Sequence, residues 1–309
     1  MAEYKGIHGT KVQDFSSNPA NPITGQVWYN ETANTLRVFT GTLANGWSTA
    51  NSLNTARANL GAAGIQTATL AFGGSAVPGF VGNTELYNGT NWTEVNDLNT
   101  AREYINGAGT STAALGFGGW KPGTSSETEL WNGTNWTEVN NLSTARYGPQ
   151  GAGTSTAALA FGGNQGAPSY GPLGNVETWN GSNWTEVNDL NTARGSLAGD
   201  GATNTAALAF GGAEPANSAL TENWNGSNWT EVNDLNTARN SLAGAGTNTA
   251  ALAFGGTTGS VTGATETWNG TNWTEGNDLN TARNSLAGSG ISTLALAFGG
   301  SSPTQGTTE

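Results

Sequence analysis

The chain has 309 residues, with ten Lys and Arg against 22 Asp and Glu, so its formal net charge is −12. The absence of Cys and the single His exclude a disulfide scaffold and disfavour zinc, haem and thiol sites. The missing cationic excess disfavours binding to nucleic acid. Because disordered chains are poor in aromatic residues, the twelve Trp predict a folded protein despite the 47 Gly.

The N-terminal part differs in composition from the rest. Residues 1–26 are rich in Asn, Pro and Ser and show no periodicity, which is typical of an extended arm. Val27, Trp28 and Tyr29 form a short apolar run of unassigned place, and 36–41 reads as a strand. We expect an arm or docking segment at 1–34 and a second domain at 35–309. No stretch resembles a secretory signal, and no run of about 18 apolar residues occurs, so we expect no membrane insertion.

A unit of 44 to 48 residues recurs six times after the arm. Each copy contains the string TAR, a Trp ten residues before its arginine, and the string FGG further on. The arginines are Arg57, Arg102, Arg146, Arg194, Arg239 and Arg283, and the tryptophans are Trp47, Trp92, Trp136, Trp184, Trp229 and Trp273. A repeat of this length predicts a solenoid or a propeller.

Each unit divides into four short strands. After Arg239 come a small-residue strand (241–246), a tight turn, and an apolar strand closed by two glycines (250–256). A variable loop leads to a third strand ending at Trp268, and an Asn-Gly turn precedes the strand that starts at Trp273. Four strands per repeat favour a β-propeller blade, and an open β-solenoid is the alternative architecture.

The repeat resembles the kelch family. In that family a blade has an arginine near its start, Gly-Gly after the second strand, an aromatic residue in the third strand and Trp in the fourth. Here these positions read Arg239, Gly255 and Gly256, Trp268 and Trp273. The resemblance covers residues 36–309 and implies an all-β, six-bladed kelch-like β-propeller with four antiparallel strands per blade.

The ends of the chain predict how such a ring closes. The last unit stops at Glu309, where its third strand is due to begin, and Trp47 belongs to a fourth strand without a preceding FGG. The segment 36–41 fits the missing third strand. We therefore expect N-terminal strands to complete the last blade, which would remove exposed sheet edges.

No residue set indicates catalysis. The six arginines would form either an anion-binding ring or, as we favour, buried pairs with carboxylates such as Glu231 and Glu266 at blade junctions. The carboxylates outside the repeat template, Glu103, Glu127, Asp200 and Glu214, are expected to be isolated surface groups. We therefore predict a protein without enzymatic activity, cofactor or metal.

The repeats differ from one another in the loop after FGG. These loops lie at 75–84, 120–128, 164–176, 213–220, 257–265 and 301–308. In a propeller they emerge on the same face as the links between blades, so one face carries dissimilar loops on a uniform scaffold. The predicted ligand-binding residues of this face are Phe80, Trp120, Lys121, Tyr170, Tyr104 and Tyr147. Flat aromatic rings among Asn, Ser and Thr suit sugars, whereas loop drift without function is the alternative.

The segment GTKVQDFSSNPANPITGQVWYNETANTLRVFTG (9–41) resembles the start of tail and other structural proteins of marine bacteriophages. This resemblance implies a virion protein assembled in the host cytoplasm, whose arm binds other virion proteins and which can form homo-oligomers. Our first hypothesis is a non-enzymatic tail-fibre or surface protein whose loop face attaches to a host glycan or receptor. A structural or decoration protein is the second hypothesis, and a polysaccharide depolymerase is the third.

Overall fold

The computed structural model describes residues 13–15, 27–30, 32, 35–38, 46–167, 169 and 171–309. The chain divides into two compact units, Met1–Gly46 and Trp47–Glu309. The first contains β1 (Gln13–Phe15), β2 (Val27–Asn30) and β3 (Thr35–Val38). In this sheet β1 is parallel to β2, and β2 is antiparallel to β3. The other residues of the predicted arm lie outside the described residues.

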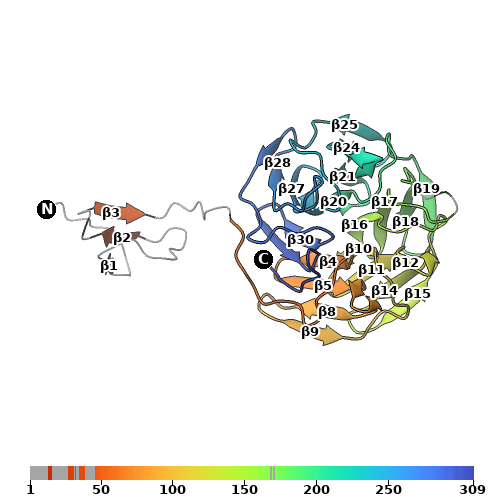
Figure 1. Ribbon diagram of the computed structural model, residues 1–309, viewed down its shortest axis with the longest axis horizontal. Coiled ribbons are helices and arrows are strands. Elements are labelled where there is room, and N and C mark those ends of the chain that lie inside the picture. The colour runs from red at the N-terminus through yellow and green to blue at the C-terminus, as the bar shows by residue number, and fades with distance from the viewer. Residues whose placement is uncertain are drawn as a thin grey trace. The chain divides into compact units, whose positions relative to one another are not determined.

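The second unit is a β-propeller (Figure 1). It contains five antiparallel four-stranded sheets, which we call blades 1 to 5 and number in chain order. Their strands are β4 (Gly61–Ile65), β5 (Ala68–Phe72), β8 (Thr84–Tyr87) and β9 (Trp92–Val95); β10 (Asn106–Thr110), β11 (Ala113–Phe117), β14 (Thr128–Trp131) and β15 (Trp136–Val139); β16 (Gln150–Thr154), β17 (Ala157–Phe161), β18 (Val176–Trp179) and β19 (Trp184–Val187); β20 (Ala198–Thr203), β21 (Ala206–Phe210), β24 (Thr221–Trp224) and β25 (Trp229–Val232); and β26 (Ala243–Thr247), β27 (Ala250–Phe254), β28 (Thr265–Trp268) and β29 (Trp273–Glu275). The described residues contain no helix, and therefore no helix that could span a membrane.

The prediction of six four-stranded blades is wrong, because only five form. The sixth repeat contributes a two-stranded sheet, β30 (Ala287–Ile291) with β31 (Leu294–Phe298). Its β30 lies beside both β26 and β4. Isolated bridges join Phe298 to Thr308 and Thr308 to Ala50, where a blade has its third and fourth strands.

The third strand expected from 36–41 is not found beside β31. Residues 35–38 are β3 and pair with β2 in the first unit. Beside β31, Glu309 and Ala297 exchange backbone hydrogen bonds of 2.8 and 2.9 Å. The physical reason lies in the end of the chain, because Thr308 and Glu309 repeat the Thr-Glu pair with which β28 begins, Thr265 and Glu266.

The hydrophobic core lies between neighbouring sheets. One cluster combines Phe72 of blade 1 with Trp131 and Trp136 of blade 2, all buried. The rings of Phe72 and Trp136 meet edge to face at 4.9 Å between centroids. Equivalent contacts join Phe117 to Trp184 and Phe161 to Trp229. Because a buried aromatic side chain removes roughly 150–250 Å² from water, the repeated Phe and Trp hold adjacent sheets together.

The innermost strands converge because they carry small residues. Gly107 of β10 and Gly151 of β16 lie so close that a Cβ on Gly151 would stand 2.2 Å from the Gly107 oxygen. Only glycine permits this approach. The inner strands β4, β10, β16, β20, β26 and β30 thus surround a narrow central channel, visible in Figure 1 as the meeting point of the sheets.

Three of the variable loops contain short hairpins. They are β6 (Ser75–Ala76) with β7 (Gly79–Phe80), β12 (Trp120–Lys121) with β13 (Gly123–Thr124), and β22 (Ala213–Glu214) with β23 (Ala216–Asn217). Each hairpin follows the second strand of its blade, as the sequence predicts for the loop position. The first residue of each also bridges the link that precedes the blade, as in Glu103 with Trp120. The hairpins and links therefore lie on one face, the loop face.

Candidate functional site

The six repeat arginines are fully buried and ion-paired. Each guanidinium lies 2.5 to 2.9 Å from a glutamate of the same repeat: Glu85, Glu129, Glu177, Glu222, Glu266 and Glu309. The partner is the glutamate of the third strand, so Glu266 serves Arg239 while Glu231, on the fourth strand, does not. Desolvation lowers the pKa of Arg57, Arg146, Arg194 and Arg283, and the paired glutamate opposes this shift.

The glutamates carry more than the arginines. Glu266 Oε2 also accepts hydrogen bonds from the backbone and side-chain nitrogens of Asn236, at 2.7 and 2.9 Å. Asn236 lies in the link that enters the blade, so the carboxylate ties this link to the third strand. Both carboxylate oxygens and the guanidinium are thereby engaged. These groups form the framework of the blade and are not an open anion site.

Three aromatic side chains meet on the loop face. Trp120 begins the β12–β13 hairpin, while Tyr104 and Tyr147 follow the arginines of blades 2 and 3. The Tyr147 ring lies 5.5 Å from Trp120 and 5.5 Å from Tyr104, edge to face in both pairs. Tyr104 is 37% exposed, and the other two are partly buried. We call these three residues the aromatic cluster.

Charged groups border the aromatic cluster. Lys121 Nζ bonds Glu127 Oε1, and Glu127 Oε2 lies 3.3 Å from Arg102. Glu127 is therefore part of an ion-paired group and not an isolated surface carboxylate. Burial, with a smaller contribution from Glu103, raises the pKa of the Tyr104 phenol. The cluster is thus a neutral platform with a cation and a carboxylate at its edge.

The other predicted loop-face residues are placed differently. Phe80, on β7, is 39% exposed and makes no aromatic ring contact within the described part of the chain. Tyr170 lies outside the described residues. The structure therefore brings together Tyr104, Trp120, Lys121 and Tyr147 and leaves Phe80 apart.

A ring of left-handed residues surrounds the channel mouth on the loop face. Its members have φ between 51° and 62° and are Asn59, Tyr104, Gly148, Ser196, Ser241 and Ser285. Five backbone hydrogen bonds of 2.8 to 2.9 Å link them head to tail, and among these residues only Ser196 N does not donate to its neighbour, Gly148 O. A cavity of about 80 Å³ lies at this mouth and is lined by Tyr104, Tyr147 and Asn164.

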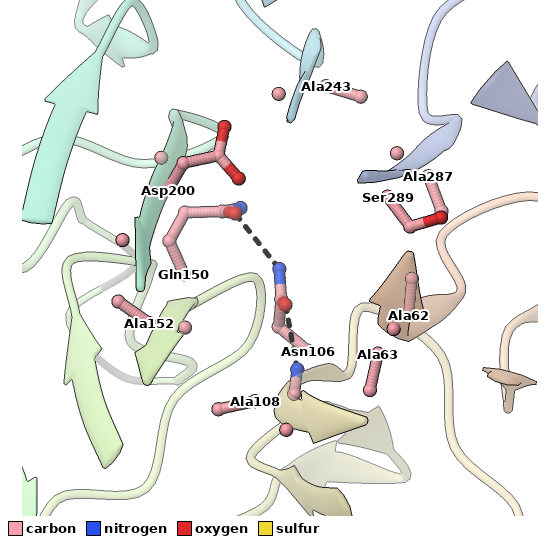
Figure 2. A pocket seen from close by; sticks show the side chains of 18 of the residues that line it. Ala62, Ala63, Asn106, Ala108, Gln150, Ala152, Asp200, Ala243, Ala287 and Ser289 are labelled. Carbon is pink, nitrogen blue, oxygen red and sulfur yellow. Dashed lines mark hydrogen bonds between the residues drawn. The ribbon is translucent and has the colours of Figure 1, made fainter. Parts of the chain in front are cut away.

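The channel itself holds a cavity of about 320 Å³. Alanine and glycine form most of its wall, but Asn106, Gln150 and Asp200 project polar groups into it (Figure 2). Asn106 donates to Gln150 Oε1 at 3.0 Å, and Gln150 donates to the Leu197 oxygen at 2.9 Å. Asp200 Oδ2 is buried and has no hydrogen-bond partner.

The placement of Asp200 corrects the sequence interpretation, which took this residue for an isolated surface group. The signal was present in the repeat, because β20 reads AGDG where β26 reads AGAG. An aspartate in an inner-strand position faces the channel. A register shift after Asp200 also marks this strand as irregular. Burial raises the pKa of Asp200 well above its usual value.

No protein-family model matches the chain, and no curated protein is detectably similar to it. The functional argument therefore rests on the residues and their geometry. Within the described residues, no group of three or more His, Cys, Asp or Glu side chains is arranged to hold a metal ion.

Proposed function

We propose that this protein is a non-enzymatic attachment protein whose loop face binds a glycan through the aromatic cluster. The observation that carries the proposal is the meeting of Trp120, Tyr147 and Tyr104 on one face, beside Lys121. Aromatic faces pack against the C–H surface of a sugar ring, and their indole and phenol groups bond its hydroxyls. Tyr104 and Tyr147 also line the cavity at the channel mouth, which offers a second polar wall.

Comparison between repeats supports a local specialisation of blades 2 and 3. Where Trp120 stands, the equivalent positions hold Ser75 and Ser301, and where Tyr147 stands they hold Asn240 and Asn284. The scaffold therefore accepts small polar residues at these places. The bulky aromatic residues are dispensable for the fold of the other repeats, which favours a binding role for them.

The test uses the repeat itself to supply safe substitutions. The full chain and a Trp120→Ser, Tyr147→Asn variant are applied to an array of bacterial surface glycans. Ile65→Thr, at a 55% exposed side chain where β10 has Thr110, is the matched control outside the aromatic cluster. We expect the wild type and the control to bind one glycan group and the double variant to lose at least about tenfold in affinity, or roughly 1.4 kcal/mol. Equal binding by the double variant would refute the aromatic site.

We further propose that the protein works in a phage virion. The resemblance of residues 9–41 to phage structural proteins supports this proposal, with the first unit as the part that binds other virion proteins. A decoration protein that only stabilises the particle is the second candidate, and a depolymerase is the third. Deleting the propeller from the particle separates the first two, since only attachment predicts a loss of adsorption. Release of reducing ends from host polysaccharide would instead indicate the depolymerase.

We also propose that 47–50 closes the ring as a fourth strand. Two contacts support this proposal. Trp47 Nε1 bonds Thr265 Oγ1 at 3.1 Å, as Trp273 bonds Thr221, and Ala50 N donates to Thr308 O at 2.8 Å. We expect Trp47→Ala to lower the melting temperature of the full chain about as much as Trp273→Ala. An unchanged melting temperature would contradict the closure.

A further inference from the structure

We propose that the central channel binds a divalent cation of the calcium class beside Asp200. This proposal is independent of the glycan site, since it concerns the channel lining and not the aromatic cluster. It begins from an unmatched charge. Asp200 lies on β20, and Oδ2 of its carboxylate is buried with no hydrogen-bond partner.

The strands packed around Asp200 offer nothing to neutralise it. The neighbouring inner strands read QGAGT in β16 and AGAGT in β26, and its sheet partner β21 reads AALAF. None of these strands, nor the rest of β20, contains a charged side chain. An isolated carboxylate out of bulk water is strongly unfavourable unless a counter-charge is supplied. The direction of the Asp200 pKa shift reflects this cost in the empty channel.

The channel has room for a hydrated ion at this point. A cavity of about 320 Å³ would hold on the order of ten waters at roughly 30 Å³ each. Asp200 leans over Gly244, where a Cβ would stand 2.4 Å from Oδ2. The glycine therefore leaves space beside the carboxylate that any other residue would fill.

The available donors are oxygen atoms, which selects the class of cation. The side chains of Asn106, Gln150 and Ser289 line the same cavity (Figure 2). Each inner strand also has one edge without a strand partner, which leaves backbone oxygens toward the channel. Calcium takes six to eight oxygen ligands, including carbonyls and water, in flexible geometry. Neither nitrogen nor sulfur ligands of the kind that zinc or copper prefers lie in the lining.

The charge count sets the strength of binding. With one carboxylate, the site belongs to the weak end of protein calcium sites, with dissociation constants of about 10⁻⁴–10⁻³ M. The net charge of −12 raises the local concentration of cations and favours their entry. The channel is thus expected to fill at millimolar calcium.

The experiment compares the full chain with Asp200→Asn and with Glu138→Gln. Glu138 is an exposed carboxylate on β15, so its variant removes the same charge from the surface. Equilibrium dialysis with radioactive calcium measures binding at constant ionic strength, maintained with tetramethylammonium chloride. We expect one calcium per wild-type chain and per Glu138→Gln chain, and at least a tenfold weaker association for Asp200→Asn.

A second measurement covers any change of fold in the variants. Calcium is expected to raise the melting temperature of the wild type and of Glu138→Gln, but not that of Asp200→Asn, whose own unfolding transition reports that it is folded. Absence of bound calcium in the wild type would overturn the proposal. Equal binding by Asp200→Asn would also overturn it, by assigning the ion to surface carboxylates.

Discussion

Trp229 Nε1 is buried without a hydrogen-bond partner because Val176 stands where the other repeats place a threonine. The other five repeat tryptophans donate to the threonine of the preceding repeat at 3.0 to 3.1 Å; these pairs are Trp47–Thr265, Trp92–Thr308, Trp136–Thr84, Trp184–Thr128 and Trp273–Thr221. Val176 and Trp229 pack in the same buried cluster. The contact is thus retained, but one polar group is left unsatisfied.

Val176→Thr is expected to stabilise the protein. The new hydroxyl would accept the hydrogen bond of Trp229 Nε1, and satisfying a buried donor contributes about 1 kcal/mol. The shapes of Val and Thr are similar, although the hydroxyl offsets part of the gain by removing a buried methyl group. Chemical denaturation measured by tryptophan fluorescence should show a higher midpoint.

The reverse change provides the control. Thr128→Val removes the acceptor of Trp184 Nε1 and is expected to destabilise the protein by about 1–3 kcal/mol, since a buried donor then remains unpaired. If both substitutions shift the midpoint in the same direction, the hydrogen bond does not govern the stability of this contact.

The repeat also explains what could be predicted from the sequence. The positions of Arg239, Gly255 and Trp273 recur because every blade uses them alike, so the propeller and its strand order followed from the period. The closing region could not be predicted in the same way. The sixth repeat has only Thr308 and Glu309 of its third strand, and the segment 35–38, which has strand composition, pairs with β2 instead.

The candidate site was predictable only in part. Trp120 and Tyr147 stand out because they break the repeat in loops, which is visible in the letters. Their ring contact depends on how far blades 2 and 3 are apart, which the sequence does not contain. Asp200 was misjudged because a lone carboxylate is usually a surface group, and only its register in β20 shows that it faces the channel.

Arg239→Met is expected to destabilise the protein by about 3–5 kcal/mol. The substitution leaves Glu266 as an uncompensated buried charge, which is the costly way to break a buried pair. Lys121→Met is the matched control. It breaks a pair whose two side chains are 33% and 21% exposed, so the expected loss is below about 1 kcal/mol. Urea denaturation of both variants checks the difference, and equal losses would contradict the structural role of the buried pair.

Ser241→Val is expected to destabilise the ring at the channel mouth. Ser241 has φ of 52°, a left-handed conformation that a β-branched residue adopts only with strain. We expect a loss of about 1–3 kcal/mol. Ser241→Gly is the control, because Gly148 already occupies the equivalent place, and it should be neutral or slightly stabilising. A Val variant as stable as the Gly variant would show that the ring relaxes without cost.

Asp200→Asn is expected to stabilise the protein in a pH-dependent way. The folded pKa of Asp200 is raised above its unfolded value, so protonation favours the folded state. Below about pH 4 the carboxyl is protonated in both states and costs nothing. As the pH rises through the folded pKa, the wild type increasingly bears the cost of a buried charge, at about 1.4 kcal/mol per unit of pKa shift.

The measurement is the melting temperature of the wild type and of Asp200→Asn between pH 4 and pH 8, in buffer containing a calcium chelator. The variant should melt higher at pH 8, and the difference should vanish toward pH 4. Glu138→Gln should show no such gain, because its carboxylate lies at the exposed surface. A lower melting temperature for Asp200→Asn at pH 8 would mean that the carboxylate is paired in solution. In that case added calcium could not stabilise the wild type by supplying a missing counter-charge.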